Sequence, residues 1–131
     1  MQYCEHELKS ILEDRKLAFT HSQLKRLIMQ LLLAVDFMHK SFVMHRDLKT
    51  SNLLYTNEGI LKVCDFGLAR TFTKTKQKQY TNWVVTLWYR APELLLGCDT
   101  YNEKVDMWSV GCIFAELILR EPLFAAKTEM D

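Results

Sequence analysis

"VMHRDLKTSNLLY", residues 43–55, places a histidine, an arginine, an aspartate, a lysine and an asparagine in one short stretch bounded by apolar runs. A simple turn requires only residues such as Asn, Asp or Gly. The combination of a carboxylate, two cations and an amide at fixed offsets therefore indicates a stretch that performs chemistry.

The composition describes one globular unit with no electrostatic preference for a partner. The chain has 131 residues, of which 49% are hydrophobic and 25% charged, and no segment repeats or drops to low complexity. Its 17 Lys and Arg residues against 16 Asp and Glu residues leave a net charge of +1. Neither direct nucleic-acid binding nor association with an anionic membrane is therefore expected.

The sequence predicts an intracellular protein, located in the nucleus or the cytoplasm. No window approaches the roughly eighteen apolar residues of a membrane span, and the N-terminus lacks the apolar core of a signal peptide. The four cysteines are scattered without a CxxC pair. We therefore expect free thiols in a reducing compartment rather than disulfides or a zinc site.

Hydrophobic spacing predicts a long helix that ends near residue 40. Ser22 is a suitable N-cap, and apolar residues follow it at intervals of three and four. These residues are Leu24, Leu27, Ile28, Leu31, Leu32, Val35 and Met38. A second helix is expected from about Val105 to Leu119, and because apolar side chains surround it, it should be buried within a larger fold.

Short strands are expected on both sides of the opening stretch. The runs 42–45, 52–56 and 60–64 are apolar or β-branched, and residues 57–59 (Asn-Glu-Gly) form a hairpin-like turn between the last two. From Gly67 to about Tyr80 the sequence is polar and shows no periodicity, so no regular element is expected there.

Three motifs follow one another in the order of the protein kinase signatures. HRDLKTSN (45–52) fits HRDLxxxN, DFG stands at 65–67 and APE at 91–93. The chain therefore resembles the eukaryotic protein kinases. Within them, VVTLWYRAPELLLG (84–97) resembles the cyclin-dependent kinases, and EHELKS (5–10), HRDLKTSN and VDMWSVGCIF (105–114) resemble their PITSLRE branch.

The resemblance covers essentially the whole chain and implies an incomplete protein kinase-like α+β fold. Residues 1–131 would form a partial kinase domain with the hinge, helices D to F, the catalytic loop and the activation segment. This part is a mainly α C-lobe with a small β element. The Gly-rich loop, the strand lysine and the helix C glutamate of a complete kinase do not occur in the sequence, so the N-lobe is expected to be absent, as are the terminal C-lobe helices.

The resemblance implies phosphoryl transfer from ATP, with Mg²⁺, to Ser or Thr side chains of proteins. This reaction depends on positioning and charge neutralisation, and hard oxygen ligands suit Mg²⁺. By resemblance, Asp47 would orient the substrate hydroxyl and accept its proton, and Lys49, typical of serine/threonine kinases, would stabilise charge on the moving phosphoryl group. Asp65 and Asn52 would each bind a magnesium ion, and Thr86 would hydrogen-bond Asp47 and Lys49.

The implied ATP site combines the hinge with the strands that follow the catalytic loop. Adenine would pair with the backbones of Gln2 and Cys4, and Met1 would be the gatekeeper. The other implied contacts are Glu7 with the ribose, and Leu54 and Cys64 on the pocket floor.

The resemblance also implies activation by a cyclin-type partner and by phosphorylation. An upstream activating kinase would phosphorylate Thr81, and Arg46 and Arg70 would grip the phosphate. Val85 would adopt a positive φ and, braced by Arg90, form a pocket for proline. The expected substrates are therefore proteins with Ser/Thr-Pro sites.

Other residues are interpreted as structural. By resemblance, Asp106 would hold the backbone of the catalytic loop, and Glu93 would pair with an arginine that the sequence does not include. His45 would brace the loop. The remaining histidines, His6, His21 and His39, are interpreted as surface residues.

Two questions stay open at this level. These residues alone should have little or no kinase activity and poor stability, so a second hypothesis is a truncated, non-catalytic decoy for substrates or partners. The activation segment carries Lys74, Lys76 and Lys78 and no acidic residue between Asp65 and Glu93. It is either an ordinary solvated loop or a segment that favours acidic partners.

Overall fold

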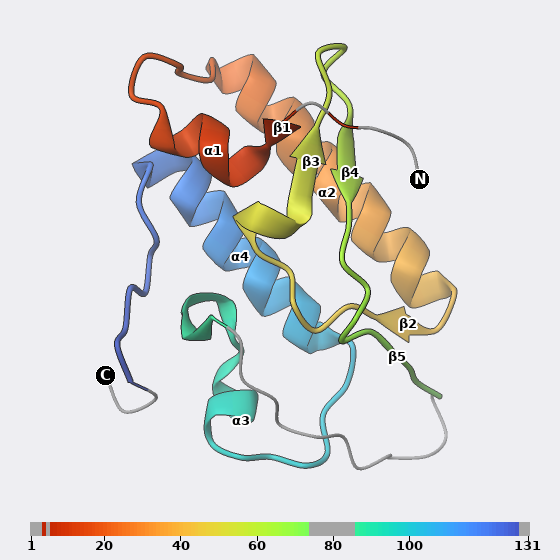
Figure 1. Cartoon of the computed structure of the whole chain (residues 1–131). Helices are drawn as coiled ribbons and strands as arrows, with labels where there is room; N and C mark the ends of the chain where they lie inside the picture. Colours follow the sequence, from red (N-terminus) through yellow and green to blue (C-terminus); the bar gives the residue numbers. More distant parts are fainter. Residues whose placement is uncertain (1–3, 5, 74–85, 129–131) are drawn as a thin grey trace.

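Helices α2 and α4 form the framework of the chain, and short strands cover one side of it (Figure 1). The computed structural model describes residues 4, 6–73 and 86–128. In chain order the elements are β1 (His6–Glu7), α1 (Leu8–Glu13), α2 (His21–Lys40), β2 (Val43–Met44), β3 (Leu53–Tyr55), β4 (Leu61–Val63), β5 (Arg70–Thr71), α3 (Pro92–Leu95) and α4 (Lys104–Leu119). Two 3₁₀ turns, Thr50–Asn52 and Leu87–Tyr89, lie between them. No helix within these ranges is long and apolar enough to cross a membrane.

The N-terminus of α2 is fixed by a capping box rather than by Ser22. The Thr20 Oγ1 accepts a hydrogen bond from the Gln23 backbone N–H at 3.3 Å, and the Gln23 Oε1 accepts one from the Thr20 backbone N–H at 2.8 Å. The predicted Ser22 cap is therefore wrong. Thr20 has a glutamine three residues further on, so two backbone donors are satisfied at once.

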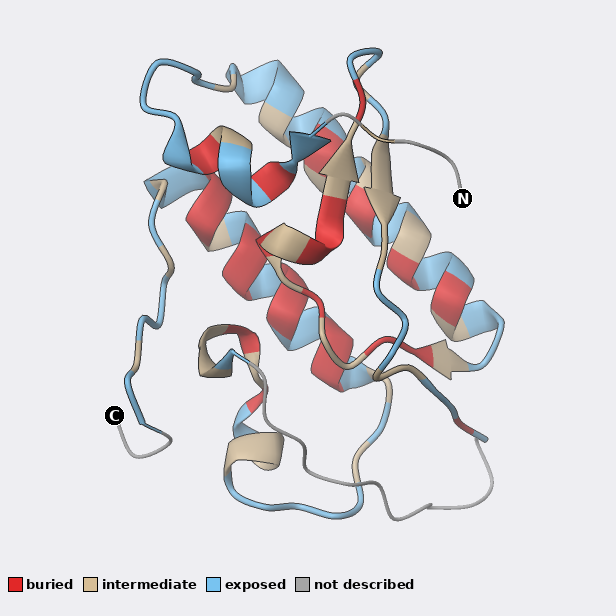
Figure 2. Cartoon of the chain, in the orientation of Figure 1, coloured by how far each residue is buried: buried red, intermediate tan, exposed pale blue. Residues whose placement is uncertain are grey.

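The core lies where α2 and α4 pack against each other and against α1. Leu27, Leu31, Val35 and Met38 form the buried face of α2, as the predicted apolar spacing requires. The same buried cluster contains Val110, Ile113 and Leu117 of α4 and Leu8 and Leu12 of α1. Figure 2 shows the buried faces of the two long helices turned toward each other.

One face of α4 is open. Trp108, Phe114 and Ile118 expose 40%, 46% and 56% of their surface, so the burial expected within a larger fold is found on one face only. A groove of about 520 Å³ lies between this face and the start of α2. Its apolar lining residues are Leu12, Ala18, Phe19, Leu24, Ile28, Phe114, Leu117 and Ile118.

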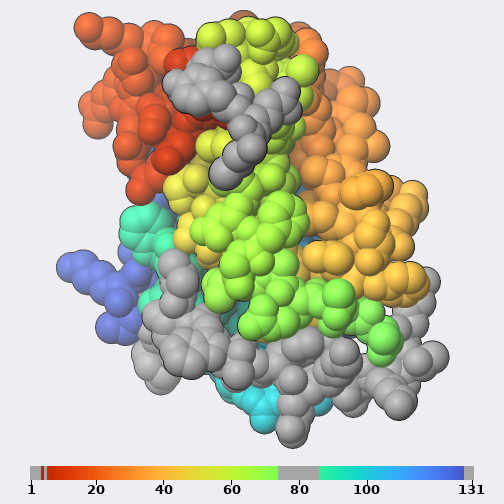
Figure 3. Space-filling model, turned by 45° about the vertical axis from the view of Figure 1, so that its right-hand side comes forward, coloured from red at the N-terminus to blue at the C-terminus, as the bar shows by residue number. Residues whose placement is uncertain are grey.

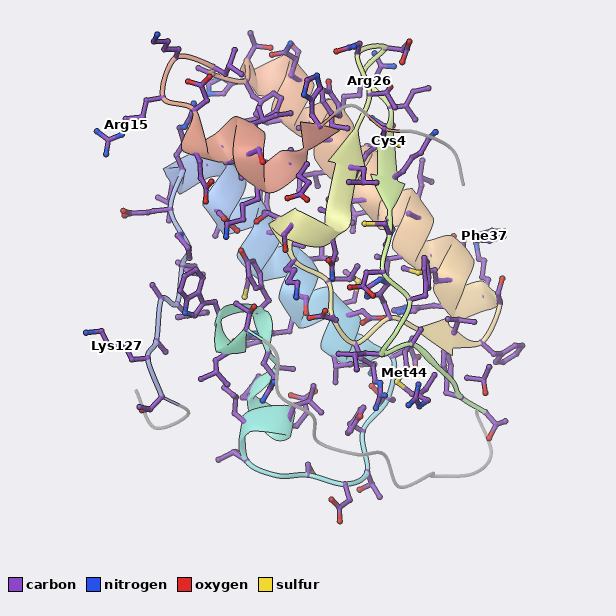
Figure 4. All side chains as sticks on the ribbon, in the orientation of Figure 1. Cys4, Arg15, Arg26, Phe37, Met44 and Lys127 are labelled. Carbon is purple, nitrogen blue, oxygen red and sulfur yellow. The ribbon has the colours of Figure 1, made fainter. Side chains whose placement is uncertain are left out.

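On the outer side of α2, Phe37 points away from the body of the molecule (Figure 4).

The strands form two small antiparallel sheets. β1, β3 and β4 pair in the order β1-β3-β4, and β2 pairs with β5. The predicted hairpin between β3 and β4 is confirmed, and Gly59 takes a φ of +82° in its turn. The stretch after Gly67 was expected to lack regular structure, but its part up to Thr73 contains β5. A two-residue strand is too short to leave a periodic pattern in the sequence.

The capping box predicts different costs for two neighbouring hydroxyl residues. We expect Thr20→Ala to lower the free energy of unfolding by about 1 kcal/mol, because it leaves a helix N–H without its acceptor. Ser22→Ala, within the first turn, should change it by less than about 0.5 kcal/mol. Urea denaturation of the two variants compares them, and a larger loss in Ser22→Ala would contradict the observed cap.

Candidate active site

The stretch 45–52 is held in place by a buried carboxylate on α4. Asp106 is 0% exposed, and its Oδ2 and Oδ1 accept hydrogen bonds from the backbone N–H groups of His45 at 2.9 Å and Arg46 at 2.8 Å. Arg46 has a φ of +69°, a left-handed conformation that costs a non-glycine residue about 1–2 kcal/mol. The two bonds to Asp106 stabilise this turn and fix the direction in which the next residue leaves it.

The ring of His45 joins the loop to the DFG segment. It is buried, its Nε2–H donates to the Cys64 carbonyl at 3.0 Å, and its Nδ1 accepts from the Asp47 N–H at 3.3 Å. The ring also packs edge-on against the ring of Phe66, with 4.9 Å between the two ring centroids. All three contacts fit the bracing role expected for His45.

Asp47, Lys49 and Asn52 form one hydrogen-bonded group. The Asn52 Nδ2 donates to the Asp47 carbonyl at 2.8 Å and to its Oδ2 at 3.1 Å, and the Lys49 Nζ lies 3.0 Å from the same Oδ2. The Asp47 and Lys49 side chains are only 13% and 14% exposed. In such a partly dehydrated site the ion pair is stronger than at the surface, so the orientation of the carboxylate is set before any ligand binds.

Asp65 and Asn52 offer oxygen atoms that suit Mg²⁺. Cys64 donates its backbone N–H to the Asn52 carbonyl at 3.0 Å, which ties the residue before Asp65 to the catalytic loop. The Asp65 Oδ1 accepts the Gly67 N–H at 3.2 Å. Among the described residues no donor is bonded to the Asp65 Oδ2 or the Asn52 Oδ1. A carboxylate and an amide oxygen fit a metal whose other ligands are phosphate oxygens and water.

The two arginines expected to grip a phosphate are both close to the β2–β5 sheet. Arg46 donates through Nε to the Leu68 carbonyl and through Nη1 to the Tyr101 hydroxyl, both at 2.7 Å. Arg70 pairs with Met44 in the sheet and is exposed, with its guanidinium bonded to the adjacent Ala69 carbonyl. The segment after β4 runs down the face of the molecule beside α2 (Figure 3). The expected phosphosite Thr81 lies outside the described residues.

Of the residues around the expected substrate pocket, the structure describes Thr86 and those that follow it in the chain, including Arg90. Thr86 is exposed, and the predicted hydrogen bonds from Thr86 to Asp47 and Lys49 are not present. It lines a small cavity together with Asp47 and Arg90. Val85 lies outside the described residues.

Glu93 occupies the first turn of α3. A carboxylate in that position is favourable for the helix dipole. No hydrogen bond or ion pair of its side chain occurs in the described part of the chain.

Several residues expected to contact the nucleotide lie within the described part of the chain, and they are close to the three-stranded sheet. Glu7 on β1 pairs with Leu54 on β3, and Cys64 directly follows β4. Burial raises the pKa of the Cys64 thiol, and the nearby Asp65, Glu7 and Cys4 raise it further. Cys4 lies beside this sheet (Figure 4). Met1 and Gln2 are outside the described residues.

The protein kinase domain family matches residues 1–131. This chain belongs to the protein kinase family. Its sequence is 56% identical over 131 residues to rice (Oryza sativa) cyclin-dependent kinase G-2 and to human cyclin-dependent kinase 11B, covering all of this chain and 18% and 16% of those proteins. Serine/threonine-protein kinase ppk23 of Schizosaccharomyces pombe is 53% identical over the same 131 residues, which are 33% of its length.

The kinase fold is confirmed by a solved structure. The crystal structure of the yeast RNA Pol II CTD kinase CTDK-1 complex matches with a TM-score of 0.92 and 44% identity, covering 98% of this chain and 41% of that chain. The sequence-based assignment to the cyclin-dependent kinases, PITSLRE branch included, is confirmed by the relatives. The kinase chain spans one third or less of the length of these curated relatives.

A second buried acid of the kinase chain was missed by sequence reasoning. Glu116 on α4 accepts hydrogen bonds from the Tyr89 hydroxyl at 2.6 Å and the Thr50 hydroxyl at 3.3 Å. Burial raises the pKa of Glu116, and burial next to this carboxyl group raises that of Tyr89. No sequence signal marks Glu116, because its partners lie 27 and 66 residues away along the chain.

The raised pKa of Glu116 predicts a pH-dependent stability. In the folded chain this carboxyl group holds its proton to higher pH than in the unfolded chain, where the pKa is near 4.5. The folded state therefore loses stability as the pH rises above about 4.5. We expect Glu116→Gln to remove this loss, so the variant should gain stability relative to wild type as the pH rises above about 4.5.

Denaturant unfolding at several pH values measures this difference. Glu121→Gln, at an exposed position after α4, is the matched control and should show no such trend, because Glu121 is not among the groups that act on the pKa of Glu116. Parallel curves for wild type and Glu116→Gln would refute the assignment.

Proposed function

We propose that this chain is the catalytic-loop part of a cyclin-dependent-type serine/threonine kinase that transfers phosphate from ATP to Ser or Thr of proteins. The observation that carries the proposal is the group of Asp47, Lys49 and Asn52, joined by hydrogen bonds and tied to the segment of Asp65. A cation, a carboxylate and metal-binding oxygens in one partly buried cluster suit the positioning and charge neutralisation that this reaction requires.

Asp47 is proposed to receive the substrate hydroxyl. Its Oδ2 is held by Lys49 and Asn52, whereas none of the described residues donates to its Oδ1. A Ser or Thr hydroxyl that donates to Oδ1 would be oriented by a fixed carboxylate, which can then accept its proton. Lys49, 3.0 Å from Oδ2, keeps a positive charge beside the group that is transferred.

ATP and Mg²⁺ are the proposed cofactors. The Asn52 Oδ1 and the Asp65 carboxylate would hold the metal, which supplies charge neutralisation of the phosphate oxygens when bound. Glu7 would contact the ribose, with Leu54 and Cys64 below the base, in line with the pairing of Glu7 with Leu54. The backbones of Gln2 and Cys4 would pair with adenine next to Met1.

Regulation and substrate choice are proposed from the family. A cyclin-type activator and an upstream kinase acting on Thr81 would switch the enzyme on, with Arg46 and Arg70 gripping the phosphate. Val85 and Arg90 would accept proline after the target residue, so the substrates would carry Ser/Thr-Pro. The names of the relatives and a structural relative described as a kinase complex support the cyclin-type partner and the protein substrates.

A single substitution tests the catalytic assignment. In the full-length protein expressed from its own gene, with a cyclin-type partner, ATP, Mg²⁺ and a Ser-Pro peptide, we expect Asp47→Asn to lower kcat at least about 100-fold with little change in the KM for ATP. The Asn side chain has nearly the same shape as the Asp side chain, but its amide cannot accept the proton of the substrate hydroxyl. Phosphate transfer to the peptide is measured with labelled ATP.

Asp36→Asn is the matched control, because Asp36 is an exposed carboxylate paired with Lys40 at 2.7 Å. It should leave kcat unchanged. Residues 1–131 alone should show little or no turnover, since they include neither a Gly-rich loop nor the strand lysine. A full-length wild type that binds the peptide and never phosphorylates it would support a decoy and overturn the proposal.

A further inference from the structure

Arg46 is held through both its backbone and its side chain. The Asp106 carboxylate that accepts its backbone N–H also lies 2.8 Å from the Nε2 of His39, which is only 16% exposed, so the interpretation of His39 as a surface residue is wrong. The guanidinium of Arg46 donates from Nε to the Leu68 carbonyl and from Nη1 to the Tyr101 hydroxyl, both at 2.7 Å. The position of this positive charge is therefore fixed by separate parts of the chain.

Tyr101 reaches Arg46 from a distant position in the sequence. It is half-buried in the loop between α3 and α4, 55 residues beyond Arg46. This loop rises to the corner where β2 and β5 pair (Figure 1). Met44, which pairs there with Arg70, lies just before the catalytic loop (Figure 4). The phenol therefore joins Arg46 at the same corner as Arg70, the other arginine expected to grip a phosphate.

Leu68 and Tyr101 orient the guanidinium without neutralising it. A backbone carbonyl and a phenol carry no net charge, so these two bonds leave the positive charge of Arg46 uncompensated by either partner. A phosphate monoester carries nearly two negative charges at pH 7 and several strong acceptor oxygens. An oriented guanidinium is a suitable donor for such an anion.

The Tyr101 hydroxyl can bind the same anion. A phenol oxygen that accepts an N–H from a cation keeps its own proton, which must point toward a different acceptor. Hydrogen bonds in such a chain strengthen one another, so a phenol bonded to a guanidinium is a better donor than an isolated phenol. Because the two groups are 2.7 Å apart, a phosphate that contacts Arg46 can contact both.

We propose that Tyr101 is a phosphate-binding residue, whose hydroxyl donates to the phosphate of phosphorylated Thr81 beside Arg46. The family resemblance implied only the two arginines, Arg46 and Arg70. Tyr101 adds a neutral donor, and it also holds the Arg46 guanidinium before the phosphate arrives, which lowers the cost of binding. The inference rests on the proposed activation by phosphorylation and names a further ligand of the activating phosphate.

The full-length protein with phosphothreonine incorporated at position 81 tests this contact. Phosphorus-31 NMR follows the second ionisation of the phosphate, whose ordinary pKa is about 6. Donors favour the dianion, so the wild-type phosphate should have a pKa below that value. Tyr101→Phe removes the hydroxyl and keeps the ring, and it should raise the phosphate pKa by about 0.3 to 1.

A second readout is the rate at which a phosphatase removes the phosphate. The phosphate must leave its donors before it is cleaved, so Tyr101→Phe should be dephosphorylated at least about fivefold faster than wild type. Tyr55→Phe is the matched control, because Tyr55 is also half-buried and belongs to the other sheet. It should change neither the phosphate pKa nor the rate.

A double substitution separates a direct contact from an effect through Arg46. In an Arg46→Gln background, Tyr101→Phe should still raise the phosphate pKa, because the hydroxyl itself donates to the phosphate. No further change in that background would assign the effect to the placement of Arg46 and overturn the proposal. A wild-type phosphate with the ordinary pKa would overturn it without reference to any variant.

Slower dephosphorylation of Tyr101→Phe would also overturn the proposal, because it would mean that the phenol competes with the phosphate for Arg46. Neither readout depends on kinase activity. A wild-type protein that shows the expected pKa difference but never phosphorylates a Ser-Pro peptide would overturn the proposed catalysis and support the phosphate contact.

Discussion

The site depends on a negative charge buried at the start of α4. Asp106 is 0% exposed, and three donors surround its carboxylate: the backbone N–H groups of His45 and Arg46 and the imidazole of His39. A buried carboxylate without these bonds would be strongly unfavourable, and the left-handed Arg46 would have no anchor. The carboxylate and the turn therefore stabilise each other, and their position determines where Asp47 lies.

The same helix holds the far end of the catalytic loop through a second acid. Glu116 is ten residues beyond Asp106, about 15 Å along an α-helix, and it accepts hydrogen bonds from Thr50 and Tyr89. Asp106 fixes the loop where it begins and Glu116 fixes it at the 3₁₀ turn that leads to Asn52. Asp47 and Lys49 lie between these two attachments to α4. The apolar packing of α4 against α2 supports both attachments.

The sequence was sufficient for features that depend on local pattern. The motifs at 45–52 and 65–67, the helix ending at Lys40 and the hairpin around Gly59 all follow from residue order and spacing. Features that depend on a distant partner were missed. His39 has the spacing of an ordinary helix residue, and only the arrival of Asp106, 67 residues later, makes it part of the site. Thr86 was expected to form hydrogen bonds to Asp47 and Lys49, but its side chain is exposed, and no spacing rule describes the direction of such a side chain.

The two proposed metal ligands are prepared to different extents. Asn52 is buried, its amide nitrogen is bonded twice to Asp47, and its remaining oxygen is directed by those bonds. Asp65 is exposed, and within the described ranges its carboxylate is bonded only to the N–H of Gly67, two residues away, so it is oriented by its own left-handed turn. Rigid donors lower the cost of binding, whereas mobile donors must be ordered when the ligand arrives. The catalytic loop is thus held on α4 before any ligand binds, whereas the Asp65 carboxylate would have to be ordered by the proposed nucleotide and metal.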